Sequence, residues 1–217
     1  MKQKLSVLLA LCFCVSMLCC SALADVTNAN DVSTGTLSDV GAFPDVPATA
    51  PYAEAVNTLH EYGIINGDNK GNFNPNSTIT RAEAATIICR IAGVEDAARK
   101  ENAVIFSDVP TSHWANGYIT MAKKQGIIDG YGNGKFGPND SVTYAQILKM
   151  IICEVGYEDE AIQKGGYPDG YIAVANELNV TKGVMFDKSK PAPRCDVARF
   201  LFAVMTLSDS YEGGYIE

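Results

Sequence analysis

The feature that most constrains the fold of this chain is an internal repeat. Four separate sequence blocks return, and every block returns after the same offset of 63 residues. The first copy holds Phe43-Pro44-Asp45-Val46, Gly63-Ile64-Ile65-Asn66-Gly67, Gly71-Asn72-Phe73-Asn74-Pro75 and Thr80-Arg81-Ala82, and the second holds Phe106-Ser107-Asp108-Val109, Gly126-Ile127-Ile128-Asp129-Gly130, Gly134-Lys135-Phe136-Gly137-Pro138 and Thr143-Tyr144-Ala145. Agreement of four blocks at one offset indicates a duplicated structural unit.

A third, more divergent copy follows the first two. Tyr167-Pro168-Asp169 is similar to the opening Phe-x-Asp, whereas the Gly-x-Phe-x-Pro segment is lost. Pro193 then opens a last apolar helix that we expect to reach Met205. We therefore predict repeats at 43–105, 106–160 and 161–207. A polar, flexible linker at 25–42 precedes them and a polar tail at 208–217 follows.

Each repeat has the pattern of a helix, a loop and a second helix. In the first repeat, apolar residues between 52 and 62 recur at helical spacing, and Gly63 is placed to end that helix. Residues 67–76 are dense in Gly, Asn and Pro, as in a turn-rich loop. A second amphipathic helix follows from 80 to 91.

One such helix pair cannot bury its apolar faces alone, so neighbouring repeats must cover them. The three repeats together are long enough to form one core. We therefore predict an all-α bundle of three helix–loop–helix units, with the three second helices packed near a common axis.

Residues 1–24 have the pattern of a secretory signal peptide. Lys2 and Lys4 precede an apolar run at 5–20, and Ala22-Leu23-Ala24 forms a small-residue cleavage site. A membrane anchor is the alternative, but the run is short for a spanning helix, which needs ~20 apolar residues. A lipoprotein is a further alternative, although no small residue stands directly before Cys19. The pattern favours a secreted chain that leaves the membrane after cleavage.

Composition excludes several other classes. The formal charge is −8, and it becomes −10 when Lys2 and Lys4 are removed, so the chain is a poor general binder of nucleic acid or of anionic membranes. Four of the seven cysteines lie within residues 1–24. The remaining Cys89, Cys153 and Cys195 are odd in number, so at least one is unpaired within a monomer. We expect Cys89 and Cys153 to be buried thiols.

Taken together, the blocks resemble the S-layer homology family over roughly residues 43–207. The matching elements include the His113-Trp114-Ala115 helix start and Thr80-Arg81-Ala82-Glu83. The resemblance implies a pseudo-threefold module with ligand grooves between units. It also implies binding to a secondary cell-wall polysaccharide, often pyruvylated, at the bacterial cell surface. Gly67 and Gly130 close matching blocks, and the resemblance places them among the ligand-binding residues.

Thr80 and Glu83 have a structural explanation as a capping box, in which the Thr hydroxyl and the Glu carboxylate satisfy helix amides. Arg81 has no such explanation, because a cation at the start of a helix opposes the helix dipole. An Arg beside free helix N–H groups would suit a carboxylate such as a pyruvyl ketal. A surface ion pair is the alternative for Arg81.

Trp114 is the one tryptophan of the chain, and it suits either stacking on a sugar or filling an interface between units. No repeat carries the full set of family residues: the second has Tyr144 in place of Arg, and the third has Arg194 after Pro193. We therefore expect about one competent groove, in which Arg81 and Trp114 meet, with Arg194 as a further candidate.

Metal and catalytic sites are not indicated. The segment 129–140 resembles a calcium loop in its central glycine, but Tyr131 and Lys135 interrupt the ligand positions and its last residue is Asp. His60 and His113 lack a nucleophile motif. We predict a non-enzymatic anchor without cofactors that binds wall polysaccharide, and another surface protein is a possible partner. A structural or protein-interaction module with weakened sugar binding is the alternative, and a wall-acting enzyme is the third.

Overall fold

The chain is described by a computed structural model from residue 41 to residue 211, with side chains up to residue 207. The predicted signal peptide, nearly all of the linker and most of the tail lie outside these residues. Three pairs of helices dominate the described part: α2 (Ala53–Glu61) with α3 (Arg81–Ile91), α5 (Asn116–Lys124) with α6 (Tyr144–Glu154), and α8 (Asp169–Glu177) with α9 (Arg194–Tyr211). Short helices α4 (Glu95–Ala98) and α7 (Glu158–Gln163) precede the second and third pairs. The all-α prediction is confirmed.

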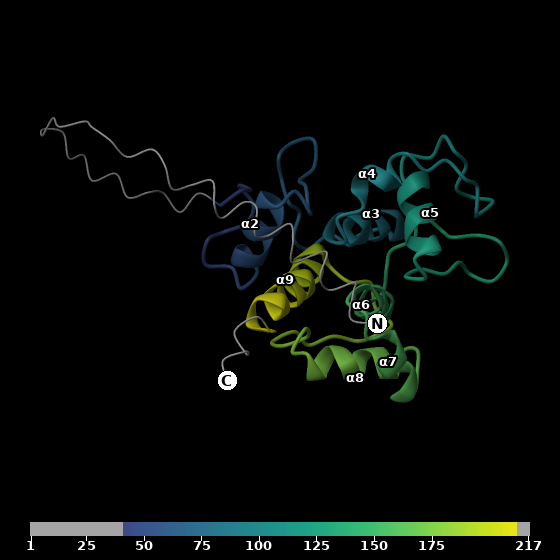
Figure 1. Ribbon diagram of the computed structural model, residues 1–217. Coiled ribbons are helices and arrows are strands. Elements are labelled where there is room, and N and C mark those ends of the chain that lie inside the picture. Colours follow the sequence, from purple (N-terminus) through teal and green to yellow (C-terminus); the bar gives the residue numbers. More distant parts are fainter. Residues whose placement is uncertain (1–40, 212–217) are drawn as a thin grey trace, which may run out of the picture.

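The three pairs form a closed ring in which each first helix packs on the second helix of a different pair. Helix α5 packs on α3, α8 packs on α6, and α2 packs on α9. Figure 1 shows the last of these contacts, where the blue α2 lies beside the yellow α9 although they stand at opposite ends of the described chain. Because α6 also contacts both α3 and α9, the second helices gather at the centre, as the repeat pattern predicts.

The centre of the ring is apolar at equivalent positions of the three second helices. Ile88, Ile151 and Leu201 lie at the same place in α3, α6 and α9, and each is at most 1% exposed. Full burial of an Ile or Leu side chain stabilises a fold by about 1.5–3 kcal/mol. These residues therefore make the core that a single helix pair lacks.

The starts of the second helices are locked to the loop of the next pair. In α3, the backbone amides of Arg81 and Ala82 donate to the carbonyls of Asp140 and Pro138 at 2.8 and 3.0 Å. The amides that begin α6 donate in the same way to the loop before α9, and those that begin α9 donate to the loop before α3. An unpaired helix-start amide is costly when water is excluded, so each pair completes the hydrogen bonding of its neighbour.

The third helix pair corresponds to the first two pairs through other residues than the sequence predicts. Gly117 in α5 packs so tightly that a Cβ would lie 2.0 Å from the Ala98 carbonyl oxygen, and Gly170 in α8 has the same relation to Ala161. Gly170 is therefore the equivalent of Gly117, and Tyr167 is the equivalent of Trp114. The prediction that Tyr167-Pro168-Asp169 repeats the Phe-x-Asp opening is wrong.

The predicted boundary between residues 160 and 161 falls inside α7. Helix α7 contacts α8 as α4 contacts α5, so it has the role of α4 and connects the second pair to the third.

The thiols of Cys89 and Cys195 are buried and that of Cys153 is half-buried, and none of the three forms a disulfide bond within the described part of the chain.

Among the helices at residues 41–211, none combines the length and apolarity that crossing a bilayer needs.

Candidate functional site

Three grooves lie at equivalent positions around the ring. Each is lined by the loop within one pair, by the second helix of that pair, and by the residue two positions before the first helix of the next pair. That last residue is Trp114, Tyr167 or Pro51, and we name the Trp114 groove, the Tyr167 groove and the Pro51 groove after it. Their volumes are similar, at about 330, 320 and 340 Å³.

The Trp114 groove is the more polar of the two that carry an aromatic residue. Trp114 is 59% exposed, and its ring stacks on that of His113 with centroids 5.9 Å apart. The charged residues of this groove are Asp68, Glu83, Arg90 and Arg194. An exposed indole that already rests on another ring offers a flat, rigid face to a ligand.

The Tyr167 groove is more apolar. Tyr167 and Tyr131 line it, and they are 53% and 50% exposed. Its apolar floor is made by Ile127, Ile128, Phe136 and Met150, and its charged residues are Arg81, Asp129 and Lys149. Two exposed tyrosines beside an apolar floor suit the apolar face of a sugar ring, with hydroxyl groups left to bind polar edges.

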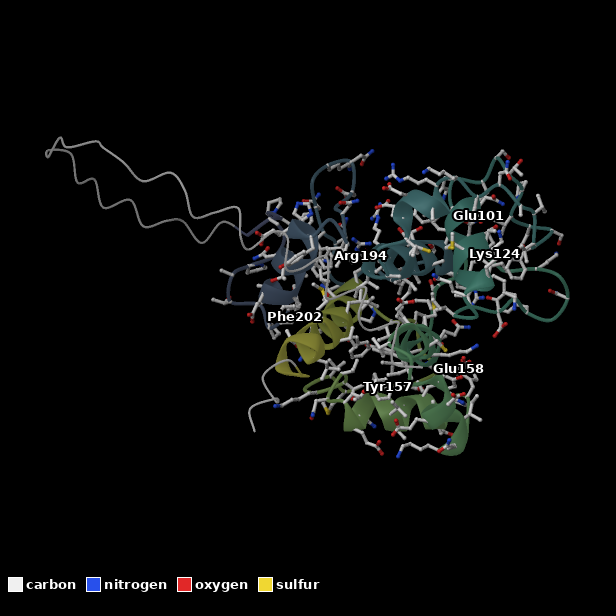
Figure 2. All side chains as sticks on the ribbon, viewed as in Figure 1. Glu101, Lys124, Tyr157, Glu158, Arg194 and Phe202 are labelled. Carbon is white, nitrogen blue, oxygen red and sulfur yellow. The ribbon has the colours of Figure 1, made fainter. Side chains whose placement is uncertain are left out.

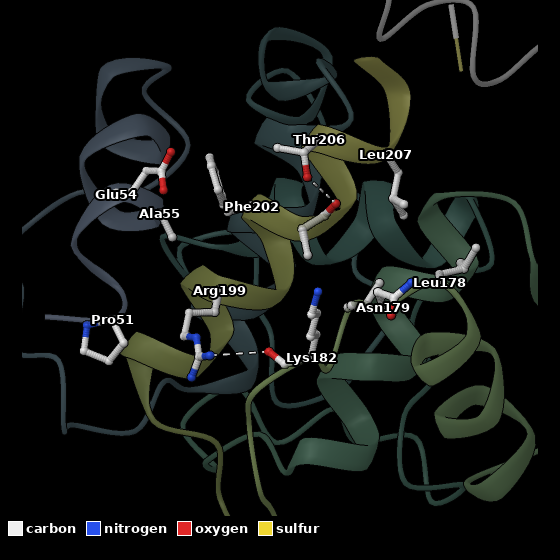
Figure 3. A pocket seen from close by; sticks show the side chains of 12 residues that line it. Pro51, Glu54, Ala55, Leu178, Asn179, Lys182, Arg199, Phe202, Thr206 and Leu207 are labelled. Carbon is white, nitrogen blue, oxygen red and sulfur yellow. Dashed lines mark hydrogen bonds between the residues drawn. The ribbon is translucent and has the colours of Figure 1, made fainter. Parts of the chain in front are cut away.

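The Pro51 groove lies between α2, α9 and the loop after α8. Figure 3 shows Phe202 of α9 near Ala55 of α2 on one side, and Arg199 directed toward Lys182 on the other. Arg199 donates to the backbone carbonyls of Lys182 and Gly183 at 3.4 and 3.1 Å. Pro51 replaces the exposed aromatic residue of the other two grooves.

Arg81 is a clamp between two pairs, and this corrects the prediction that it sits beside free amides. The side chain is 7% exposed and reaches from α3 into the loop of the second pair. Its Nε donates to the Phe136 carbonyl and its Nη2 to the Asp129 carbonyl, both at 2.8 Å. The guanidinium also lies over the rings of Tyr131 and Phe136, 4.8 and 4.4 Å from their centroids. Burial lowers the pKa of Arg81, which nevertheless keeps its charge at any physiological pH.

Arg81 and Trp114 do not meet in one groove, so that prediction is also wrong. Arg81 lines the Tyr167 groove, whereas the residue beside Trp114 is Arg194. Figure 2 shows Arg194 in the middle of the molecule, at the start of α9. It repeats the clamp, because its Nε and Nη2 donate to the carbonyls of Phe73 and Asn66 at 2.7 and 2.9 Å.

Tyr144 takes the place of the arginine in the second pair. Its ring stacks on Phe186 with centroids 4.9 Å apart, and its hydroxyl donates to Asp196 at 2.5 Å. Phe186 is thus the counterpart of Phe73 and Phe136. The lost Gly-x-Phe-x-Pro motif hid this residue from the sequence comparison.

The remaining predicted residues have structural roles at the groove walls. Thr80 and Glu83 form the capping box: the Glu83 amide donates to the Thr80 hydroxyl at 3.2 Å, and the Glu83 carboxylate accepts from the Thr80 amide at 2.7 Å. Gly67 lines the Trp114 groove and Gly130 the Tyr167 groove. A Cβ at Gly130 would lie 2.5 Å from the ring of Phe106, so both glycines permit a close approach of the loop to the core.

Two aspartates that shape the groove loops were not recognised as such from the sequence. Asp45 accepts from the amides of Phe73 and Asn74 at 2.8 and 2.6 Å, and Asp108 accepts from those of Phe136 and Gly137 at 2.8 Å each. Burial raises the pKa of Asp108, but these two amides, the amide of Asp108 itself and the charge of Lys135 together outweigh it, and the net shift is downward. The recurrence of Phe-x-Asp was the available signal.

Asp129, the first residue of the 129–140 segment, is paired with two lysines. Lys123 and Lys149 each donate to a different oxygen of Asp129 at 2.7 Å, and these bonds lower the pKa of Asp129 to about 2. Asp140 accepts from the Tyr131 hydroxyl at 2.8 Å. The segment is a groove wall, and no cluster of three or more metal-ligating side chains occurs among the described residues.

The family comparison matches two segments of the chain. The model of the S-layer homology domain matches residues 42–85 and residues 105–148. These segments contain the first two helix pairs up to the middle of α3 and α6.

Three surface proteins are similar to most of this chain. A "Cell surface protein" of Thermoanaerobacter kivui is 38% identical over 161 residues, which cover 73% of this chain and 20% of that protein. A "Surface layer protein" of Brevibacillus choshinensis is 34% identical over 142 residues (63% and 12%). A "Middle cell wall protein" of Brevibacillus brevis is 32% identical over 159 residues (70% and 15%).

The chain thus spans a fifth or less of the length of these relatives. The domain matches and the surface relatives together support cell-surface anchoring, and they indicate a secreted cell-surface protein whose residues 42–85 and 105–148 match the S-layer homology domain.

Proposed function

We propose that the chain anchors itself at the cell surface by binding a secondary polysaccharide of the cell wall in the Trp114 and Tyr167 grooves. The observation that carries this proposal is the pair of exposed rings at equivalent positions. Trp114 is 59% exposed and Tyr167 is 53% exposed, and both stand over a groove large enough for a sugar residue. Because both rings stand at the same place, each at the wall of a groove, their exposure supports the binding of a ligand there.

The third helix pair is, in this proposal, a degenerate S-layer homology repeat that supports binding without a competent groove of its own. Its support is the equivalence of Gly170 with Gly117 and of Phe186 with Phe136. The Pro51 groove has no exposed ring at its mouth. Two working grooves are therefore expected, both formed with residues of the matched domains.

A pull-down with purified wall sacculi tests the proposal. The chain is mixed with sacculi before and after chemical removal of the secondary polysaccharide, and the bound fraction is measured. We expect binding to intact sacculi and its loss after removal. Equal binding to both, or binding to neither, would contradict the proposal, and hydrolysis of the wall sugars would instead favour an enzyme.

Substitutions at the exposed rings locate the binding in the grooves. Trp114→Ala and Tyr167→Ala should each weaken binding about tenfold, since a stacked ring contributes about 1 kcal/mol or more and 1.4 kcal/mol corresponds to a factor of ten. Tyr62→Ala is the matched control, because Tyr62 is 52% exposed but lines none of the three grooves. An equal loss of binding in all three variants would show that the loss does not arise from the grooves, and this would contradict the proposal.

A further inference from the structure

We propose that the two grooves select different sugars: the Tyr167 groove takes a sugar that bears a carboxylate, and the Trp114 groove takes a neutral one. This inference rests on the proposed function and assigns a ligand class to each groove. The residue that makes the distinction is Lys149.

The charges that line the grooves differ although the grooves are structurally equivalent. In the Tyr167 groove, Arg81 and Lys149 stand against Asp129, which leaves one positive charge in excess. In the Trp114 groove, Arg90 and Arg194 stand against Asp68 and Glu83, so the charges cancel.

The charges just behind the walls leave this difference unchanged. Lys123 is bonded to Asp129 behind the Tyr167 groove, and Glu95 is bonded to Arg90 behind the Trp114 groove. Asp140, which accepts from Tyr131, offsets Lys123, and Arg99, which is bonded to Glu95, offsets that acid, so the Tyr167 groove keeps one positive charge in excess and the Trp114 groove stays balanced.

Lys149 has donors left for a ligand. Its Nζ gives one hydrogen bond, to Asp129 at 2.7 Å, and an ammonium group has three donors. The second oxygen of Asp129 is already neutralised by Lys123 at 2.7 Å. Lys149 is 20% exposed on the wall formed by α6, so its charge is partly shielded from water yet accessible from the groove. A partly desolvated ammonium attracts a carboxylate more strongly than a fully hydrated one.

The arginines of the Trp114 groove are already engaged. Arg194 gives its Nε and Nη2 to backbone carbonyls, and Arg90 gives its Nε to Glu95 at 3.2 Å. Asp68 accepts from the amides of Asn72 and Lys70 and from the side chain of Asn74. Asp68 therefore stays ionised, and an incoming carboxylate would face it and Glu83 together.

At residue 83, the charge of the Trp114 groove can be changed without changing the local fold. Glu83 and Gln146 occupy the same place in α3 and α6, and both complete a capping box with the preceding threonine. The difference between them is thus the acid itself. Glu83→Gln is a conservative change for the helix, and it removes a negative charge from the Trp114 groove.

The experiment uses three probes: a methyl hexopyranoside, the same glycoside with a pyruvyl ketal, and a methyl hexuronide. Binding to the full chain is followed by titration with NMR detection at the Trp114 indole and at the Lys149 side chain. The two acidic probes separate a ketal carboxylate from a uronate carboxylate as the source of the shared chemistry. Wall binding is measured in parallel by the sacculi pull-down, which decides the proposed function separately.

We expect an acidic probe to perturb Lys149 and to bind more weakly as salt is raised. Lys149→Met should reduce its affinity about tenfold and leave the neutral probe unchanged. Glu83→Gln should increase the affinity of the acidic probe for the Trp114 groove severalfold. Lys124→Gln is the matched control, because Lys124 of α5 is paired with Glu101 at 2.7 Å (Figure 2) and lines none of the three grooves.

The inference is overturned if Lys149→Met retains the preference for the acidic probe, if that probe perturbs Trp114 rather than Lys149, or if neither acidic probe binds a chain that still binds sacculi. Failure to bind sacculi at all overturns the proposed function and this inference with it. Circular dichroism of each variant excludes unfolding as the cause of a loss.

Discussion

At the scale of single residues, the first position of each second helix joins two helix pairs. Arg81 and Arg194 insert a guanidinium between carbonyls and a phenylalanine ring of another pair, whereas Tyr144 stacks its phenol ring on Phe186 and donates to Asp196. The sequence predicts that Arg81 is unusual, because a cation at a helix start opposes the dipole. It does not reveal the partners, because the carbonyls that Arg81 binds belong to residues 48 and 55 positions away.

Arg81→Met should destabilise the fold by about 2–4 kcal/mol, because two carbonyls lose a charged donor in a site that excludes water. The free energy of unfolding is measured by urea denaturation. Arg99→Met is the control, since Arg99 is 62% exposed and a surface ion pair such as the one it makes with Glu95 contributes little to stability. If Arg81→Met leaves stability intact but abolishes sugar binding, Arg81 is a ligand contact and not a clamp.

At the scale of elements, the long helices are where the apolar periodicity predicts them. Helix α2 ends before Gly63 and the α3 segment before Gly93, and both glycines have the positive φ of 68° that favours glycine at a helix end. The short helices α4 and α7 were not predicted, since four to six residues carry too little periodicity. The packing of α5 on α3 could not be predicted from the apolar periodicity either, because an apolar helix face does not indicate which other helix covers it.

The contacts of α4 with α5 and of α7 with α8 depend on one glycine each. Gly117→Ala and Gly170→Ala would each place a Cβ 2.0 Å from a backbone carbonyl oxygen, so helix and carbonyl must separate. We expect each change to cost about 3 kcal/mol or more, as overpacking against rigid backbone does at its upper range. Thermal unfolding measures the loss.

Glu177→Ala, on the exposed side of α8, is the control for these glycine variants and should change stability by less than about 0.5 kcal/mol. Gly117→Ala with an unchanged melting temperature would mean that the close contact is not maintained in solution.

At the scale of the whole molecule, the ring makes each pair dependent on the other two. The repeat length and the number of helices predicted three units around an axis. The closure of the ring through α2 and α9 was not predicted, because it joins the ends of the repeat array and leaves no trace in the spacing of motifs. The same closure brings Arg194 beside Trp114, because the start of α9 contacts the loop of the first pair. Arg81 lies in the Tyr167 groove because the start of α3 contacts the loop of the second pair.

Removal of the third pair should therefore unfold the first two, although these contain both matched domains. A chain that ends at residue 163 would expose the faces of α2 and α6 that α9 and α8 cover, and would leave Arg81 as the one guanidinium clamp between pairs. We expect circular dichroism to show a loss of helix without a cooperative thermal transition. A cooperative transition in the shortened chain would show that the matched domains fold independently of the third pair.

The contact of α2 with α9 also has a topological consequence. Three joints connect the pairs: two of them are crossed by the backbone, and the third is held by packing and by the bonds from the start of α9 to the loop before α3. The backbone of the described chain thus runs once around a ring and leaves one joint that no covalent bond crosses. The architecture is defined by the order of the pairs around the ring, and not by the joint at which the backbone is interrupted. We therefore expect circular permutants opened at either of the other joints to adopt the same fold.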